Sequence, residues 1–292
     1  MKKWLIAAAA VGGLTAFSVL SYRRFMPAPQ SFTQKKYSVE VKPLKIQSGE
    51  HTLYGELLRP KGLTGPLPTV ICCHGFNSSY RLCKQTMGMC FAKSGLQVYC
   101  FDFYGGSKTS RSGGTMQEMS IFTEREDLTA VIEKVKTMDC VDDNNLFLLG
   151  ESQGGCVAGM TAPRFAEELK GLVLYYPAFC IPEDARKRYA SVAEIPDVDN
   201  VFGQGIGRVY SEGLLDYDVY SDILPFDKPV LIIHGDKDPV VDISYGRRAA
   251  ETYPNAKFHC LPGENHGFSG KGKLEAARLS YEFIQKQITM KG

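Results

Sequence analysis

The sequence carries almost no net charge, and this excludes one broad class of function. Its 292 residues hold 34 Lys and Arg against 32 Asp and Glu, a formal net charge of +2 at pH 7. Such a balance creates no field that would gather a polyanion, and no basic stripe with interleaved aromatic side chains is present. We therefore expect no nucleic-acid partner.

The nine cysteines include no Cys-x-x-Cys pair, which argues against a zinc site or a thioredoxin-like centre. Their odd number leaves at least one thiol without a partner in the chain. Cys72, Cys73 and Cys100 lie inside apolar runs, where cysteine behaves as a small buried hydrophobic residue. We expect mostly reduced core thiols, no metal and no cofactor.

One apolar run is long enough to interact with a membrane. It extends over nineteen uncharged residues from Trp4 to Tyr22 and has two basic residues on each side. At ~1.5 Å per residue this is about the thickness of the hydrocarbon layer, and no small-x-small cleavage site directly follows it. We expect residues 1–24 to be a membrane anchor, or alternatively a cleaved signal segment, and residues 25–36 to be a linker. The prediction is a membrane-associated protein with a single N-terminal span, or a secreted form after cleavage.

Residues 37–292 alternate between short apolar runs and segments with helical periodicity. This alternation predicts an α/β domain with a mostly parallel, twisted sheet and helices on both faces. The expected strands are 37–47, 52–59, 69–73, 96–101, 146–149, 172–176, 230–233 and 257–261. The expected helices are 79–94, 121–135, 152–160, 243–253 and 274–288.

The alternation stops after the sixth expected strand. From about residue 178 to 226 the chain is rich in Tyr, Gly, Asp and Pro, with one plausible short helix near 183–189. Unpatterned segments of this length inside α/β domains are usually lids or insertions. We expect a lid insertion here.

The segment from Leu146 to Gly155 contains the most informative motif. A buried-type strand is followed by the pattern Gly-x-Ser-x-Gly, centred on Ser152, and then by a helix-compatible stretch. This is the nucleophile elbow, a sharp strand-to-helix turn that exposes a serine hydroxyl at the end of a sheet. The alternative is a turn serine that caps a helix. The partners found elsewhere in the chain favour the nucleophile.

A serine nucleophile needs a histidine base and an acid that orients it, which follow in the order Ser, acid, His in such folds. His266 lies in a loop after the last strand, at the sheet edge expected for the elbow, whereas His259 lies within that strand. We choose His266. For the acid we choose Asp238, which precedes Pro239 in a turn, with Asp236 as the runner-up.

Two more positions bear on the site. Asp242 follows the same strand as the chosen acid, and His234 ends that strand, where a structural role is expected. The segment His74-Gly75-Phe76 ends a strand that should lie beside the elbow strand. The backbone N–H groups of Phe76 and Gln153 are therefore predicted to form the oxyanion hole.

With these residues in view, the chain resembles the α/β-hydrolases, most closely the cinnamoyl/feruloyl esterase group and next the serine-aminopeptidase-like hydrolases. The matching motifs cover about residues 40–288 in order: His74-Gly75-Phe76, Phe101-Asp102-Phe103, Glu126-Asp127-Leu128, Gly150-x-Ser152-Gln153-Gly154-Gly155, His234-Gly235-x-x-Asp238-x-Val240 and Gly263-x-x-His266-x-Phe268. The resemblance implies the same nucleophile, base and acid, and a lid over the acyl site. Within that lid, Tyr210 and Tyr220 match the family pattern and are predicted to bind substrate. One departure is Glu151, because these esterases usually carry His before the nucleophile.

Three functions follow as hypotheses. The first is a membrane-tethered serine hydrolase that cleaves small carboxylic esters through an acyl-enzyme. The second is a serine aminopeptidase or amidase with the same triad, which needs an acid for the substrate's amino group, such as Glu183, Asp184 or Asp197. The third is an inactive, membrane-attached binding module, whose mark would be a missing triad residue. None is missing.

Overall fold

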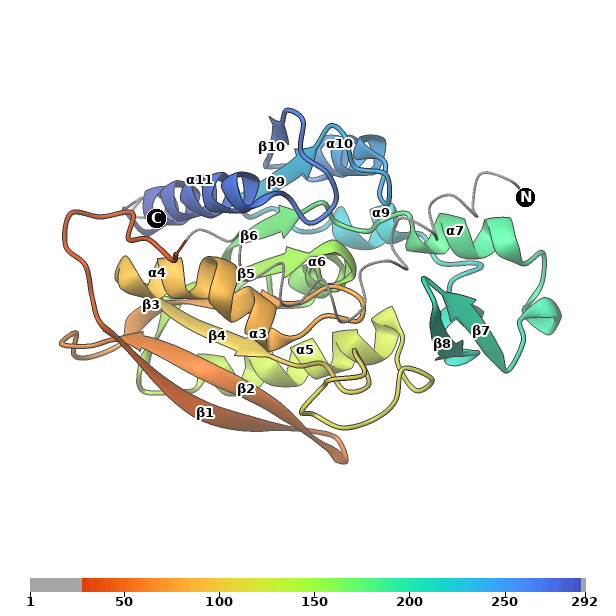
Figure 1. Ribbon diagram of the computed structural model, residues 1–292, viewed down its shortest axis with the longest axis horizontal. Coiled ribbons are helices and arrows are strands. Elements are labelled where there is room, and N and C mark those ends of the chain that lie inside the picture. The colour runs from red at the N-terminus through yellow and green to blue at the C-terminus, as the bar shows by residue number, and fades with distance from the viewer. Residues whose placement is uncertain (1–27, 290–292) are drawn as a thin grey trace.

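The apolar runs of the sequence form one large sheet in the computed structural model, which describes residues 28–289 (Figure 1). Its eight strands lie in the order β1-β2-β4-β3-β5-β6-β9-β10. Strand β2 runs antiparallel to both of its neighbours, and the pairs from β4 to β10 are parallel. The predicted α/β fold with a mostly parallel sheet is confirmed. The strands are β1 (Val39–Ser48), β2 (His51–Pro60), β3 (Leu67–Cys73), β4 (Gln97–Phe101), β5 (Val141–Glu151), β6 (Leu169–Tyr175), β9 (Val230–Gly235) and β10 (Ala256–Leu261).

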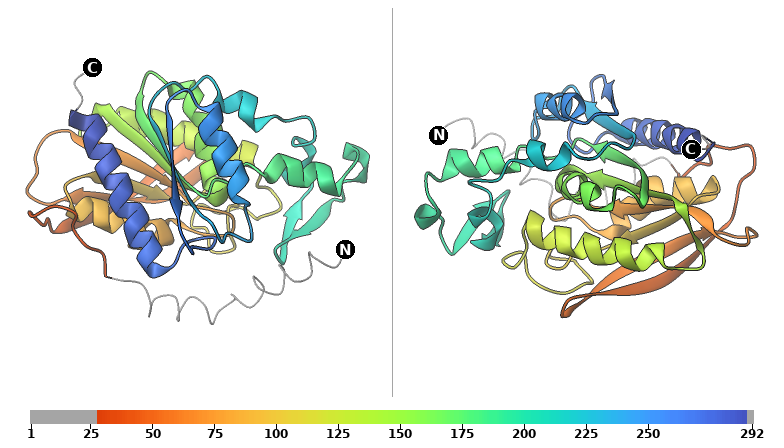
Figure 2. Two further views of the ribbon diagram at one scale, coloured as in Figure 1. Left: turned by 90° about the horizontal axis from the view of Figure 1, so that it is seen from above. Right: turned by 180° about the vertical axis from the view of Figure 1, so that it is seen from behind.

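The sheet buries both of its faces, which is why its central strands are apolar throughout. In β3, Ile71 and Cys73 pack with the cluster under α5 (Ile121–Lys136), α6 (Ser152–Thr161) and α10 (Ile243–Thr252). Val70 and Cys72 point to the other cluster, under α3 (Tyr80–Cys83), α4 (Met89–Lys93) and α11 (Gly270–Thr289). Helices therefore cover both faces, as Figures 1 and 2 show.

The helix expected over residues 79–94 is present with an irregular centre. A π turn, η1 (Lys84–Gly88), joins α3 to α4. The strand runs were readable because buried apolar residues recur in them, but a local change of helical pitch leaves no such pattern in the sequence.

The chain leaves the sheet between β6 and β9 to form a small separate layer beyond the end of the strands (Figure 1). We call residues 178–226 the insertion. It includes a two-stranded hairpin that the sequence pattern did not predict, because its strands have four residues each and Val198 is half exposed. The elements of the insertion are α7 (Ile181–Arg188), η3 (Val192–Glu194), β7 (Val198–Val201), β8 (Gln204–Gly207), α8 (Val209–Glu212) and α9 (Val219–Ile223).

The predicted membrane localisation is corrected by the structure. In the part of the chain from residue 28 to residue 289, no helix combines the length and the apolar character needed to cross a bilayer. The expected anchor, residues 1–24, lies outside the described residues. Of the expected linker, the described part packs on the domain: the Phe32 N–H donates to the Ser94 hydroxyl at 2.8 Å, and the Phe32 ring lies 5.6 Å from that of Tyr281.

A buried carboxyl group ties three elements together near the end of β1. Asp127 on α5 accepts hydrogen bonds from the Ser48 hydroxyl and from the Tyr104 N–H, both at 2.9 Å. Burial raises the pKa of Asp127 to about 6, even though the hydrogen bonds from Tyr104 and Ser48 lower it. The folded protein therefore binds a proton at Asp127 more tightly than the unfolded chain does.

This shift predicts a pH-dependent stability. Because the folded-state pKa of about 6 lies above the ordinary value of 3.8, the contribution of Asp127 is fully present below about pH 4 and is lost as pH rises through 6. We expect the free energy of unfolding to fall by about 3 kcal/mol across this window relative to Asp127→Asn. Urea denaturation of both proteins at several pH values measures the difference. Asp227→Asn, at an exposed position, is the control, and parallel curves for Asp127→Asn and the wild type would contradict the assignment.

Candidate active site

Ser152 occupies a tight turn between β5 and α6. Its backbone has φ 53°, which is unusual for a residue with a side chain. The turn is possible because the neighbouring backbones approach closely at glycine. A Cβ on Gly150 would lie 2.3 Å from the Gly154 carbonyl oxygen, and one on Gly154 would lie 2.3 Å from the His74 carbonyl oxygen. The predicted elbow therefore has the expected geometry, with the serine at the carboxyl end of the sheet.

The structure brings the three predicted catalytic side chains together. His266 Nε2 lies 3.0 Å from Ser152 Oγ, and His266 Nδ1 lies 2.8 Å from Asp238 Oδ2. The other candidates have different partners. Asp236 accepts from the Gly263 N–H at 2.6 Å, and Asp242 caps α10 through the Ser244 N–H at 2.8 Å.

The side chain of Asp238 is 0% exposed. Its Oδ1 accepts from the N–H groups of Val240 and Val241, both at 2.9 Å, and its Oδ2 lies 3.3 Å from His234 Nε2. Burial opposes ionisation, but the hydrogen bonds from His234, His266 and Val241 outweigh it and hold the pKa of Asp238 well below its usual value. Asp238 is therefore a carboxylate at neutral pH, and His234 has the structural role expected for it.

The turn after β3 passes directly beside the nucleophile. A Cβ on Gly75 would lie 3.1 Å from Ser152 Cβ and 3.8 Å from its hydroxyl oxygen. Gln153 is the second residue of α6, whose first N–H groups have no carbonyl acceptor within the helix. The two predicted oxyanion residues, Phe76 and Gln153, thus flank Ser152 from β3 and from α6.

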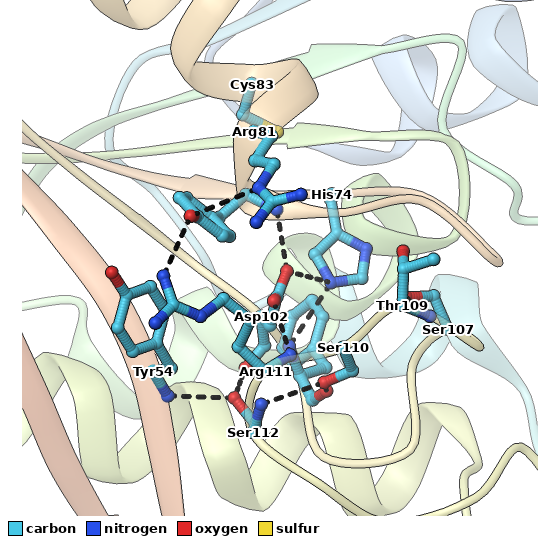
Figure 3. Close-up of polar contacts among 12 residues, drawn as sticks. Tyr54, His74, Arg81, Cys83, Asp102, Ser107, Thr109, Ser110, Arg111 and Ser112 are labelled. Atoms are coloured by element: carbon cyan, nitrogen blue, oxygen red, sulfur yellow. Dashed lines mark hydrogen bonds and ion pairs between the residues drawn. The ribbon is translucent and has the colours of Figure 1, made fainter. Parts of the chain in front are cut away.

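His74 holds this turn in place. It is fully buried, and burial lowers its pKa despite the opposing effect of Asp102. Its Nε2 accepts from the Phe103 N–H at 3.2 Å, so the proton is on Nδ1, which donates to the Gly75 carbonyl at 2.8 Å. Figure 3 shows His74 beside Asp102, whose carboxylate accepts from the backbone N–H of Arg111 at 2.9 Å. Since the Gly75 carbonyl and the Phe76 N–H belong to one planar peptide unit, His74 also sets the direction of that N–H.

A second buried network involves the side chain of Gln153, and the sequence pattern did not reveal it. Gln153 Nε2 donates to Glu124 at 2.9 Å, and Gln153 Oε1 accepts from the Tyr210 hydroxyl at 2.8 Å. Burial raises the pKa of Glu124 well above its usual value, although the bond from Gln153 lowers it. Tyr210 belongs to the insertion, and its ring packs edge-on against Phe76 with centroids 6.0 Å apart. The insertion is therefore hydrogen-bonded directly to Gln153, one of the two residues predicted to form the oxyanion hole.

The other tyrosine predicted to bind substrate lies elsewhere. The Tyr220 hydroxyl donates to the Tyr245 carbonyl at 3.3 Å, and the Arg248 guanidinium lies 3.8 Å from its ring centroid. It lines a cavity of about 310 Å³ together with Phe179 and Arg186, and no triad residue lines that cavity. The substrate-binding roles of Tyr210 and Tyr220 stay predictions. Within residues 28–289, no group of three or more His, Cys, Asp or Glu side chains is placed to hold a metal ion.

A serine on an elbow at the carboxyl edge of this sheet is the mark of one large class, and the protein is a serine hydrolase with the α/β-hydrolase fold. Residues 64–211 match the family described as serine aminopeptidase, S33, and the chain belongs to that family.

Solved structures and curated proteins agree with this assignment. Est1E from Butyrivibrio proteoclasticus, in a structure with ferulic acid bound, has a TM-score of 0.75 and 26% identity over 85% of this chain and 100% of that one. Monoacylglycerol lipase ABHD6 from Mus musculus is 20% identical, over 94% of this chain and 93% of its own length. The non-heme chloroperoxidase CPO-A1 from Kitasatospora aureofaciens is 42% identical, but that match spans only 18% of this chain and 19% of its own length. The predicted resemblance to the α/β-hydrolases is confirmed.

The close contact at Gly154 can be tested by adding one methyl group. Gly154→Ala would place a Cβ 2.3 Å from the His74 oxygen and 2.6 Å from the Cys73 oxygen, so β3 or the elbow must move. We expect a loss of stability of about 2 kcal/mol or more, the upper range for overpacking, together with a loss of activity. Urea denaturation measures the first. Gly205→Ala in the insertion is the control, since its Cβ would meet Val198 at an ordinary 3.5 Å, and equal stabilities of the two variants would contradict the packing argument.

Proposed function

We propose that the protein hydrolyses carboxylic esters of small molecules through an acyl-enzyme on Ser152. The observation that carries the proposal is the unbroken hydrogen-bonded series from Asp238 through His266 to Ser152. A serine hydroxyl is a weak nucleophile unless a base removes its proton as it attacks, and His266 Nε2 is within reach for that step. We assign the catalytic domain to residues 37–292.

The reaction then has two halves. Ser152 Oγ attacks the ester carbonyl while its proton passes to His266, and the resulting imidazolium protonates the leaving alcohol. Water attacks the acyl-enzyme in the same way, and the acid leaves as Ser152 regains its proton. Asp238 accepts the hydrogen bond from Nδ1 throughout, so that Nε2 is the nitrogen that takes the proton, and its negative charge stabilises the imidazolium.

The negative oxygen formed in each half needs donors that are already in place. We assign the N–H groups of Phe76 and Gln153 to this role. His74 orients the first through the Gly75 carbonyl, and the start of α6 presents the second. Removing one such donor typically raises the barrier by about 3 kcal/mol.

Ester substrates are favoured by the surroundings of Ser152 and by the relatives. Phe76 packs with Tyr210 and with a buried apolar cluster that includes Met119 and Ile206, which suits an acyl group better than a charged one. We assign the insertion as a lid over this acyl site. The name of ABHD6, monoacylglycerol lipase, and the ferulic acid bound to Est1E both fit an ester-type substrate.

The family description supports an aminopeptidase as the second candidate. Such an enzyme binds the α-ammonium group of its substrate through carboxylates. Two acids considered for this purpose already have a partner, because Lys187 lies 2.6 Å from Glu183 and 3.8 Å from Asp184. This arrangement favours the ester reading. An inactive binding module is disfavoured because all three triad side chains are present.

Substitutions in the triad test the mechanism. We expect Ser152→Ala to abolish hydrolysis of short p-nitrophenyl esters and labelling by a fluorophosphonate. Asp238→Asn should lower kcat on the order of 10⁴-fold, because an amide N–H facing Nδ1 imposes the wrong imidazole tautomer. Steady-state kinetics and thermal unfolding of each variant separate chemistry from folding. Undiminished turnover by folded Ser152→Ala would remove the proposal, and a wild-type protein that does not label would support the inactive module.

A paired substrate series decides between the two enzyme candidates. The wild type is given feruloyl and simple acyl esters of graded chain length, and aminoacyl amides with a free amino group. We expect kcat/KM to be at least about 100-fold higher for an ester, because two of the three acids considered for the ammonium group, Glu183 and Asp184, lie within ion-pair distance of Lys187, and about 3 kcal/mol of discrimination follows from losing a charged contact. The opposite order of kcat/KM would favour the aminopeptidase.

A further inference from the structure

Two buried residues that no step above uses lie directly behind the triad. Tyr176 follows β6 and is 3% exposed, and Glu151, the last residue of β5 and the neighbour of Ser152, is 4% exposed. The Tyr176 hydroxyl donates to Glu151 Oε1 at 3.1 Å. Polar side chains are seldom buried without a purpose, so we expect this pair, enclosed beside Ser152, to have a physical role.

The ring of Tyr176 packs against the imidazole of His266. The two ring centroids are 4.6 Å apart with the planes inclined by 58°, and the ring of Phe268 meets Tyr176 edge-on at 4.7 Å. The backbone at Tyr176 has φ 36°, in a region that a tyrosine occupies only when its surroundings enforce it. Its N–H is bonded to the Ile233 carbonyl at 2.8 Å, which fixes the residue to the neighbouring strand.

Glu151 is held from two sides. Besides Tyr176, the thiol of Cys83, on α3 just before the π turn, donates to Glu151 Oε2 at 3.8 Å. Among residues 28–289, no Lys or Arg is found at ion-pair distance from Glu151. A carboxyl group buried with only neutral donors costs free energy, and a leucine of similar size would avoid that cost. Glu151 is also the position at which this chain departs from the esterases it resembles.

We propose that Glu151 and Tyr176 form a positioning pair for His266. The inference rests on the proposed function and goes beyond it by giving the imidazole a second support. One hydrogen bond to Asp238 leaves the imidazole able to swing about that bond, and its side chain is 21% exposed on the open side. The Tyr176 ring limits the swing, and Glu151 fixes the ring through the hydroxyl.

The pair matters most after Ser152 has been acylated. At that stage the serine oxygen no longer has a proton to share, so the hydrogen bond between Ser152 and His266 is lost. Asp238 and the Tyr176 ring are then the supports that keep Nε2 aimed at the incoming water. The ring lies within the distance at which an aromatic group stabilises a cation, so it also favours the imidazolium formed in each half-reaction.

Variants of the pair test its coupling. We expect Tyr176→Leu to lower kcat by about 10- to 100-fold with KM changed less than about threefold, because misplacement of a base acts on chemistry rather than on binding. Tyr176→Phe and Glu151→Leu should each lower kcat by about 5- to 10-fold, and the double variant should lose no more than the worse single variant, the mark of a shared interaction. Glu151→Gln keeps an acceptor for the tyrosine hydroxyl and should recover most of the loss seen in Glu151→Leu.

The matched control is Tyr281→Phe on α11. It removes a buried tyrosine hydroxyl that donates to the Ser94 carbonyl at 3.2 Å. We expect its kcat to equal that of the wild type. Active serines are counted by fluorophosphonate titration, so that kcat refers to folded enzyme. The proposed pair is contradicted if Tyr176→Leu has the kcat of the wild type. It is also contradicted if the loss of kcat in the double variant equals the product of the two single losses. Either result leaves the proposed function standing. A wild-type chain that neither labels nor cleaves any ester overturns both.

Discussion

The close approach of two backbones at Gly154 is the constraint on which the site depends. Helix α6 starts so near the end of β3 that the Gly154 Cα faces the carbonyl oxygens of Cys73 and His74. This contact sets the sharpness of the turn at Ser152, whose φ is positive, and brings the Gly75–Phe76 turn beside its hydroxyl. The proposed nucleophile and the proposed oxyanion donors are therefore positioned by the same packing, and neither can move without the other.

Buried polar groups complete the carboxyl edge of the sheet. Three of the buried acids there have separate partners: Asp238 is bonded to His266, Asp102 to the N–H groups of Tyr80 and Arg111, and Glu124 to the amide of Gln153. A buried acid is tolerated only where donors replace the water that it loses. These bonds consequently order the loop after β4, where Figure 3 shows Asp102 and Arg111, and the loops after β3 and β9, which contain Phe76 and Asp238.

Sequence reasoning succeeded where a physical requirement repeats along the chain. Buried strands must be apolar, so β3, β5 and β9 were visible, and the order of serine, acid and histidine selected residues that the fold brings within hydrogen-bonding distance. It failed where the requirement is local or long-range. The β7–β8 hairpin is short and half exposed, and the bond between Tyr210 and Gln153 joins residues 57 positions apart without any periodic signal. The membrane localisation rested on composition at the N-terminus alone.

The sequence by itself determined the class of fold and the chemical groups available to it, because hydrophobic periodicity and the small residues around Ser152 follow from local sterics and burial. Only the tertiary structure decided how those groups are held. In the folded chain His234 lies beside the carboxylate of Asp238, and the Tyr210 hydroxyl donates to the side chain of Gln153. Tyr176 lies between Glu151, to which it donates a hydrogen bond, and the ring of His266. These contacts join separate loops whose distances depend on how the whole sheet packs, and the order of residues along the chain does not record such distances.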